Sequence, residues 1–169
     1  IPFETRITDL GHDGRGVARI DGKAVFVAGA LRGELVRARL LRRHRKFDEA
    51  MVESVLEASP DRVEPRCRHY DACAGCSLQH MAPPAQIAAK QQVLVENLER
   101  IGKVRPDALL PPLAAGHWGY RRKGRLSVRH VAKKGAVLVG FRDAANARFV
   151  ADIRHCEVVH PALGPKIGL

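Results

Sequence analysis

Three cysteines lie close together in one short stretch of the chain, and a fourth lies far downstream. Cys67, Cys73 and Cys76 follow the pattern C-x5-C-x2-C, and 79 residues separate Cys76 from Cys156. Gly75 gives the backbone freedom between Cys73 and Cys76, so the first three thiols can converge on one centre. The four cysteines therefore predict a metal centre with thiolate ligands.

The spacing bears on which metal this centre would hold. Structural zinc sites usually pair cysteines across about two to four residues, so a gap of five and a distant fourth cysteine fit zinc poorly. A four-iron cluster fits better, and Arg66 and Arg68 would offset its negative charge. Two alternatives stay open: zinc with His69 or His80 in place of a cysteine, and free thiols or a disulfide. The C-x3-C-x2-C spacing of radical S-adenosylmethionine enzymes is absent, which favours a closed, structural cluster.

The segment before the cysteines reads as short strands separated by turns. Asp21-Gly22 lies between two alternating apolar runs and is a hairpin signal. We expect a small OB-type barrel over residues 1–58, with little helix. The expected strands are 5–10, 17–20, 24–27, 35–41 and 50–56.

The rest of the chain predicts two further parts. Residues 59–103 form an iron-sulfur loop and a helix from 85 to about 100, because Ile87, Leu94, Leu98 and Ile101 repeat on one face and Gly102 provides a stop. Residues 104–169 form a partial β-rich α+β central domain. Its expected strands are 125–131, 136–141 and 148–153. The fold class is mainly β with some α.

Charge and hydropathy limit the partners. The 169 residues include 29 Lys and Arg against 18 Asp and Glu, a formal charge of +11. A polyanionic partner is the default expectation for such a foldable basic chain. No apolar run approaches the roughly 18 residues of a membrane span, and no stretch resembles a signal peptide. We expect a cytoplasmic protein with no membrane contact and no implied protein partner.

Two basic clusters are candidates for RNA binding. Residues 117–134 carry seven cations and no acid, with Trp118 and Tyr120 at the start, and such aromatic rings can stack on unpaired bases. Residues 37–46 carry a second cluster on one expected strand and its loop. The alternative is a solvated strand face with both aromatics in the core. The RNA-binding candidates are Arg37, Arg39, Arg43, Lys46, Arg121, Arg122, Lys123, Arg125 and Arg129.

Other chemistry has little support. The eight histidines show no paired metal-ligand spacing, and the glycines of residues 11–16 lie between strands rather than at a strand-to-helix turn. A dinucleotide site and a nucleophilic triad are therefore not expected.

The chain resembles a known family over essentially its whole length. Residues 9–18 (DLGHDGRGVA) and 25–34 (VFVAGALRGE) resemble a TRAM domain, an RNA-binding OB-like barrel. The cysteine run with its Ser-Leu-Gln-His tail, and residues 140–156, look like the iron-sulfur and central regions of bacterial 23S rRNA uracil-C5 methyltransferases. Related tRNA methyltransferases lack both barrel and cluster. Arg32 departs from the family's usual proline, which alters a turn but not the assignment.

The resemblance implies an S-adenosylmethionine-dependent parent enzyme that attacks uracil C6 with a cysteine and transfers a methyl group to C5 of a uracil in 23S rRNA. It assigns Cys67, Cys73, Cys76 and Cys156 as ligands of a [4Fe-4S] cluster. It puts the S-adenosylmethionine site and the catalytic residues in a separate Rossmann-like domain, so we expect none of them in this chain and no activity from it alone. Since methyl transfer needs no net electron, the cluster would stabilise the fold and face RNA.

Two other hypotheses remain. One is a stand-alone, metal-stapled RNA-binding or ribosome-associated module without catalysis. The other is a redox sensor whose cysteines alternate between cluster and disulfide, with RNA affinity that depends on oxidants.

Overall fold

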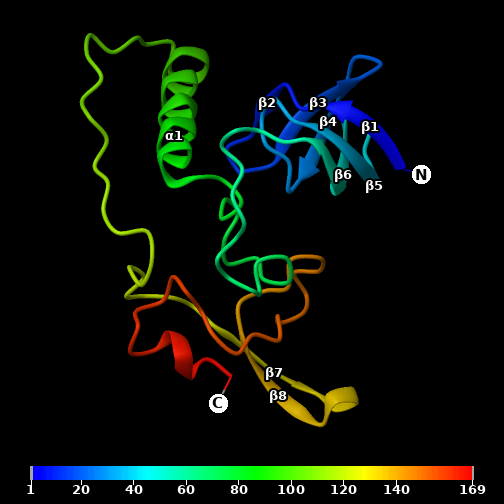
Figure 1. Cartoon of the computed structure of the whole chain (residues 1–169), viewed down its shortest axis with the longest axis vertical. Coiled ribbons are helices and arrows are strands. Elements are labelled where there is room, and N and C mark those ends of the chain that lie inside the picture. The colour runs from blue at the N-terminus through cyan, green and yellow to red at the C-terminus, as the bar shows by residue number, and fades with distance from the viewer. Residues whose placement is uncertain (1, 169) are drawn as a thin grey trace. The chain divides into compact units, whose positions relative to one another are not determined.

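The N-terminal part of the chain folds into one six-stranded sheet. The structure, a computed structural model, describes residues 2–168. The sheet has the order β1-β5-β6-β4-β3-β2 (Figure 1). All neighbours are antiparallel except β4 and β6, which are parallel. The strands are β1 (Pro2–Arg6), β2 (Asp9–Leu10), β3 (Gly16–Ile20), β4 (Lys23–Ala28), β5 (Leu35–Arg43) and β6 (Phe47–Glu57).

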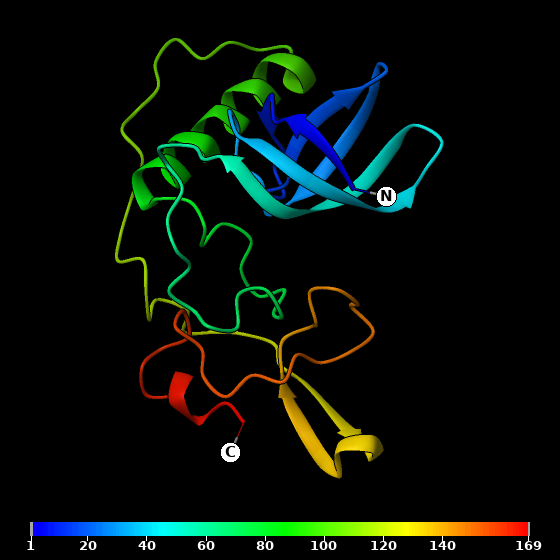
Figure 2. The same ribbon diagram turned by 45° about the vertical axis from the view of Figure 1, so that its right-hand side comes forward.

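The hairpin predicted at Asp21-Gly22 is confirmed. Ile20 pairs with Lys23, and the two turn residues have φ angles of 49° and 79°. Positive φ at both central positions is the type I′ geometry whose twist matches that of the flanking strands. The loop of the β5–β6 hairpin is shorter than expected, because β5 continues to Arg43 and His44 N–H donates to Phe47 O at 3.0 Å. Figure 2 shows this hairpin in cyan.

Strand alternation places one apolar face of the sheet in a core. Val25 and Val27 of β4 and Val36 and Ala38 of β5 are fully buried, and the intervening residues are more exposed. The period of two follows from side chains that point to opposite faces of a strand.

The strand ladders do not close this sheet into a barrel. β1 and β2 are separated by two residues yet pair with β5 and β3, at opposite edges of the sheet. Between them, Ile7 N–H donates to Glu34 O at 2.9 Å and Thr8 N–H donates to Val17 O at 2.8 Å. The predicted strand 5–10 is therefore two strands, because the chain changes partner at Ile7 and Thr8.

A buried carboxylate ties the segment after β6 to the sheet. Glu34 is fully buried, and its carboxylate accepts bonds from Arg62 Nε at 2.5 Å and Arg62 Nη2 at 2.8 Å. The same carboxylate accepts from Leu31 N–H at 2.8 Å and Ser59 N–H at 3.2 Å. Burial raises the pKa of Glu34, but these hydrogen bonds outweigh it and the net pKa is lowered.

The predicted helix is present with shifted ends. α1 runs from Pro83 to Asn97, with proline in its first turn, and continues into a π-helical turn over Leu98–Gly102. Lys103, at φ 55°, is the left-handed residue after this turn. The expected stop at Gly102 was therefore wrong by one residue, since Gly102 still belongs to the π turn.

The C-terminal part contains one short hairpin and long irregular segments. β7 (Ser127–Val131) and β8 (Ala136–Gly140) are joined by a 3-10 turn at Ala132–Lys134. The third strand expected here, 148–153, was wrong: one isolated bridge joins Arg142 to Val150, and residues 151–153 have no strand geometry. Ala151 and Ile153 are instead buried in an irregular apolar cluster with Cys156, Val158 and Ile167.

The described chain divides into two compact units. The first contains residues up to Val63 together with His80–Pro112, and the second contains Glu64–Gln79 together with Leu113 onward. Within residues 2–168, no helix has the length and apolar character needed to cross a membrane.

Candidate metal centre and nucleic-acid faces

The first three cysteines lie on a loop that is held by its own hydrogen bonds. Tyr70 N–H donates to Cys67 O and Cys73 N–H donates to His69 O, both at 2.9 Å, so the chain turns tightly between the first two cysteines. Cys67 N–H donates to Gln79 Oε1 at 3.1 Å, which joins the two ends of the loop. A side chain at Gly75 would contact Cys73 Sγ and the Phe141 ring at about 3.3 Å, so glycine permits this close approach.

The cysteine loop pairs with a segment about seventy residues further along the chain. Ala74 N–H donates to Arg142 O at 2.9 Å, and Ala144 N–H donates to Ala72 O at 3.0 Å. An antiparallel bridge joins Cys73 to Asp143 between these bonds. The loop is thereby fixed to the residues that follow β8.

The fourth cysteine belongs to the same site. Cys156 is 9% exposed, and its N–H donates to Gly164 O at 3.1 Å. Cys73 and Cys76 pack against the apolar cluster that contains Cys156. All four cysteines line one pocket, together with Phe141, Ile153 and Val158.

The thiols influence one another electrostatically. Burial raises the pKa of Cys73, and the negative charges of the other three thiolates raise it further against the opposing bond from Gly75 N–H. Burial likewise raises the pKa of Cys76, while Gln79 and the Arg121 guanidinium act in the opposite direction. A bound cation would favour the thiolate forms of Cys73 and Cys76, so this set of sulfur donors fits a metal centre.

The arrangement differs from that of a single-ion site. Within residues 2–168, no three His, Cys, Asp or Glu side chains converge closely enough to hold one metal ion. Tetrahedral zinc with bonds of about 2.3 Å holds its sulfurs about 3.8 Å apart. In a four-iron cluster each thiolate binds a different iron, so the sulfurs share one pocket at wider separations. Of the two histidines considered as zinc ligands, His69 lines the pocket and His80 does not.

Three arginines lie near the cysteines in different settings. Arg66 forms an ion pair with Glu157 at 3.2 Å and stacks on Trp118, 5.1 Å from the ring centroid. Arg68 Nε donates to His69 Nε2 at 3.3 Å. Arg121, one of the residues expected to bind RNA, lies 5.7 Å from the Phe141 centroid.

The RNA-binding candidates of the first unit fall into two groups, according to whether they form an ion pair with an acidic side chain. Arg37 pairs with Glu4 at 2.7 Å and Arg39 pairs with Glu53 at 3.0 Å, both across strands. The cations around the β5–β6 turn form no ion pair with any described residue. These cations are Arg42, Arg43, Arg45 and Lys46.

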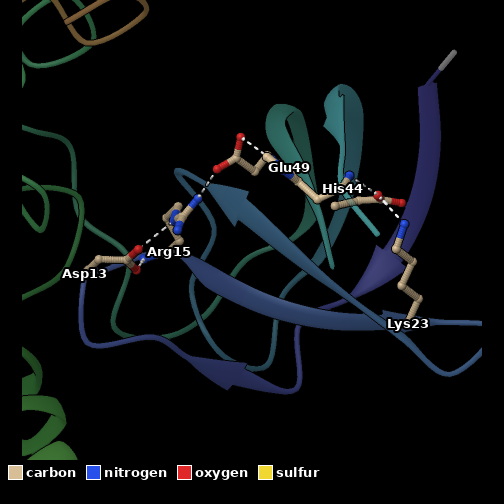
Figure 3. Close-up of polar contacts among 6 residues, drawn as sticks. Asp13, Arg15, Lys23, His44 and Glu49 are labelled. Atoms are coloured by element: carbon tan, nitrogen blue, oxygen red, sulfur yellow. Dashed lines mark hydrogen bonds and ion pairs between the residues drawn. The ribbon is translucent and has the colours of Figure 1, made fainter. Parts of the chain in front are cut away.

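A polar network lies beside this turn (Figure 3). Glu49 accepts from Arg15 at 3.2 Å and lies 3.3 Å from His44 Nε2, and Arg15 also pairs with Asp13 at 2.7 Å. The bond from His44 is the main reason that the pKa of Glu49 is lowered. His44 stacks on Phe47 with centroids 4.3 Å apart. The acids here are thus paired: Asp13 and Glu49 contact Arg15, Glu49 also contacts His44, and Asp48 pairs with Lys23 at 2.6 Å.

The RNA-binding candidates of the second unit differ in their contacts. Arg122, Lys123 and Arg125 are exposed and form no hydrogen bond or ion pair with any residue in the range 2–168. Arg129 donates to Arg148 O at 2.8 Å and lies over Phe149. Trp118, expected to stack on bases, packs against the apolar cluster beneath Arg66, whereas Tyr120 is 54% exposed.

Comparisons with known proteins relate the chain to an rRNA-modifying enzyme. Residues 3–52 match the TRAM domain. Over 99% of its length the chain is 60% identical to the 23S rRNA (uracil(1939)-C(5))-methyltransferase RlmD of Xanthomonas oryzae, and 58% identical to that of Xylella fastidiosa. The chain is therefore similar to RlmD over nearly its whole length. It spans about 38% of the length of these relatives.

A solved structure shares the fold. The Pyrococcus abyssi tRNA (uracil-54, C5)-methyltransferase, in complex with S-adenosyl-L-homocysteine, superposes with a TM-score of 0.60 over 94% of this chain and 33% of its own. The sequence identity is 23%, so this likeness concerns the fold alone. Because it covers 94% of this chain, the expectation that related tRNA methyltransferases lack the N-terminal barrel was wrong for this enzyme. The predicted resemblance to 23S rRNA uracil-C5 methyltransferases is confirmed by the RlmD relatives. The predicted TRAM domain is confirmed by the match over residues 3–52.

Proposed function

We propose that this chain is the RNA-recognition and iron-sulfur portion of an S-adenosylmethionine-dependent methyltransferase that makes 5-methyluridine in 23S rRNA. The catalytic, S-adenosylmethionine-binding domain belongs to the rest of the parent protein. The 60% identity to RlmD over 99% of the chain carries this proposal. A ribosomal RNA substrate implies a cytoplasmic enzyme.

The parent protein is the object of the direct test. Incubated with S-adenosylmethionine and unmodified 23S rRNA, it should produce one 5-methyluridine, detected by mass spectrometry of nuclease digests. The isolated chain should bind the RNA and transfer no methyl group. A parent that binds the RNA without methylation would favour the stand-alone binding module.

The proposed architecture has three parts: an OB-like TRAM barrel over residues 1–58, an iron-sulfur loop and helix over 59–103, and a partial central domain over 104–169. The match of residues 3–52 to the TRAM domain supports the first part. The pairing of β1 and β2 with opposite edges of one sheet supports a barrel, because it brings consecutive residues to both edges.

The proposed cofactor is a [4Fe-4S] cluster held by Cys67, Cys73, Cys76 and Cys156. The pocket that all four cysteines line, and the packing of Cys73 and Cys76 against the apolar cluster that contains Cys156, support it. When bound, the cluster crosslinks the cysteine loop to the distal segment that carries Cys156. Phe141, Ile153 and Val158 line the thiol pocket and would limit the access of water to the bound cluster.

The cluster proposal is tested on protein purified without oxygen. We expect brown protein with broad visible absorption and about four irons and four sulfides per chain. Cys156→Ser should lose most of this iron, whereas the matched control Ser77→Ala, on the same loop, should keep it. Colourless protein with stoichiometric zinc would contradict the cluster.

RNA binding is proposed through the cations that form no ion pair with an acidic side chain within residues 2–168, although Arg43 lies across the strands from Asp48, whose pKa is lowered by Lys23 and in smaller part by Arg43. Arg42, Arg43, Arg45 and Lys46 surround the β5–β6 turn, beside the stacked His44 and Phe47 rings. Arg122, Lys123 and Arg125 form the corresponding set in the second unit. An arginine already paired with a carboxylate must break that pair to bind phosphate, so Arg37 and Arg39 are the weaker candidates.

The salt dependence of RNA affinity tests this ranking. Replacing Arg42, Arg43, Arg45 and Lys46 with glutamine should make the slope of log K against log salt shallower by about 2 to 3, because each neutralised phosphate contributes about 0.7 to that slope. The control is the double variant Arg37→Gln, Arg39→Gln, which should change the slope by less than about 0.7. Equal effects of the two variants would contradict the ranking.

A further inference from the structure

Arg121 is set apart from its basic neighbours by the way its backbone is held. Its N–H donates to Val158 O at 2.8 Å, and its carbonyl accepts from His160 N–H at 3.0 Å. A parallel bridge joins it to Val159. The residue is therefore fixed to the segment that directly follows Cys156, and it is partly buried where Arg122 and Lys123 are exposed.

The Arg121 side chain reaches the cysteine loop. Its guanidinium lies over the Phe141 ring, and Nη1 is 3.5 Å from the carbonyl oxygen of Gly75. Gly75 lies between Cys73 and Cys76, and both Gly75 and Phe141 line the thiol pocket.

The other nearby arginines are engaged elsewhere. Arg66 is neutralised by Glu157, and Arg68 contacts His69. Arg121 forms no ion pair with a carboxylate anywhere in residues 2–168. Its charge is therefore available to the thiolates, and the planar guanidinium can stack on Phe141 and donate to Gly75 at the same time.

We propose that Arg121 is a positioning residue of the metal centre rather than a phosphate contact. Its guanidinium offsets the negative charge of the four-thiolate cluster and holds the turn between Cys73 and Cys76. This inference rests on the proposed cluster. It transfers to Arg121 the charge-balancing role that the sequence suggested for Arg66 and Arg68.

The proposal makes predictions about two measurable properties, the midpoint potential of the cluster and the retention of its iron. A [4Fe-4S]2+ centre with four thiolates has a net charge of 2−, and reduction adds another negative charge. Removal of a neighbouring cation therefore favours the oxidised form and lowers the midpoint potential. Residues around a metal's ligands typically change its retention by about 10-fold to 100-fold when substituted.

The experiment compares Arg121→Gln, Arg121→Lys and the matched control Arg122→Gln with wild type, all purified without oxygen. Iron loss is followed as decay of visible absorption under a ferrous chelator, and the midpoint potential by dithionite titration. Arg121→Gln should lose iron about tenfold faster than wild type and have a more negative potential. Arg121→Lys keeps the charge without the planar fork and should be intermediate.

The effects of the two glutamine variants on RNA binding should be in the opposite order to their effects on the metal centre. Arg121→Gln should leave the salt dependence of RNA affinity unchanged, whereas Arg122→Gln should make it shallower by about 0.7. If Arg121→Gln folds poorly, as judged by circular dichroism, Arg121→Lys provides the comparison. Iron retention and potential equal to those of the Arg122→Gln control would overturn the inference, as would a shallower salt slope for Arg121→Gln. Wild-type protein that takes up no iron would overturn the proposed cluster as well, which separates the two failures.

Discussion

At the scale of single residues, the Glu34–Arg62 pair shows how an arginine stabilises a buried carboxylate. The Glu34 carboxylate has no exposed surface, whereas the Arg62 side chain is 23% exposed. Arg62→Gln removes the cation and leaves a buried carboxylate, so the free energy of unfolding should fall by about 3 kcal/mol. Urea unfolding followed by circular dichroism measures this change.

The matched control is Arg37→Gln. Arg37 also pairs with a glutamate, but both side chains are about half exposed, at 52% and 50%. Its loss should cost less than about 1 kcal/mol. Equal costs at the two positions would mean that burial does not determine the strength of these pairs.

The lowered pKa of Glu34 also predicts a dependence of stability on pH. A carboxyl group whose pKa is lower in the folded state stabilises the fold above its ordinary pKa of 4.5, and this stabilisation is lost as the pH falls through the folded-state value. Glu34→Gln should therefore be less stable than wild type at pH 7, and the gap should narrow below about pH 4.5. A gap that is constant from pH 7 to pH 3 would contradict the assignment.

At the scale of elements, the β3–β4 hairpin depends on a backbone conformation. Gly22 has φ 79°, and a side chain there would meet no atom within 4 Å. Gly22→Ala should destabilise the sheet by about 1 kcal/mol through conformation alone. Gly22→Asn should cost about half as much, although asparagine is larger, because asparagine tolerates the left-handed region. Thermal unfolding of both variants tests the order, and a larger loss for asparagine would point to crowding instead.

At the scale of the whole molecule, the two units have separate cores, and all four cysteines belong to the second. Removal of the proposed cluster should therefore increase hydrogen exchange in residues 64–79 and 140–158 and leave the six-stranded sheet protected. Mass spectrometry of deuterated peptides, before and after treatment with a chelator, measures this. A uniform loss of protection would indicate that one cooperative unit contains both cores.

Local patterns in the sequence were sufficient for much of the fold and for the composition of the candidate site. The period-two alternation and Asp21-Gly22 predicted the β3–β4 hairpin, and the spacing of Cys67, Cys73 and Cys76 predicted a shared thiol site. Such signals lie within a few residues, where backbone geometry acts directly.

Long-range packing decided the rest. The 148–153 segment alternates like a strand, but its buried residues Ala151 and Ile153 pack into an irregular apolar cluster instead of a strand ladder. The contacts of the cations could not be predicted from the sequence either. Arg37 contacts Glu4 because of the strand register, and Arg121 contacts Gly75, which is 46 positions away in the sequence. Residue type and local spacing determine what chemistry is possible, whereas the contacts between distant segments determine which charges are left to perform it.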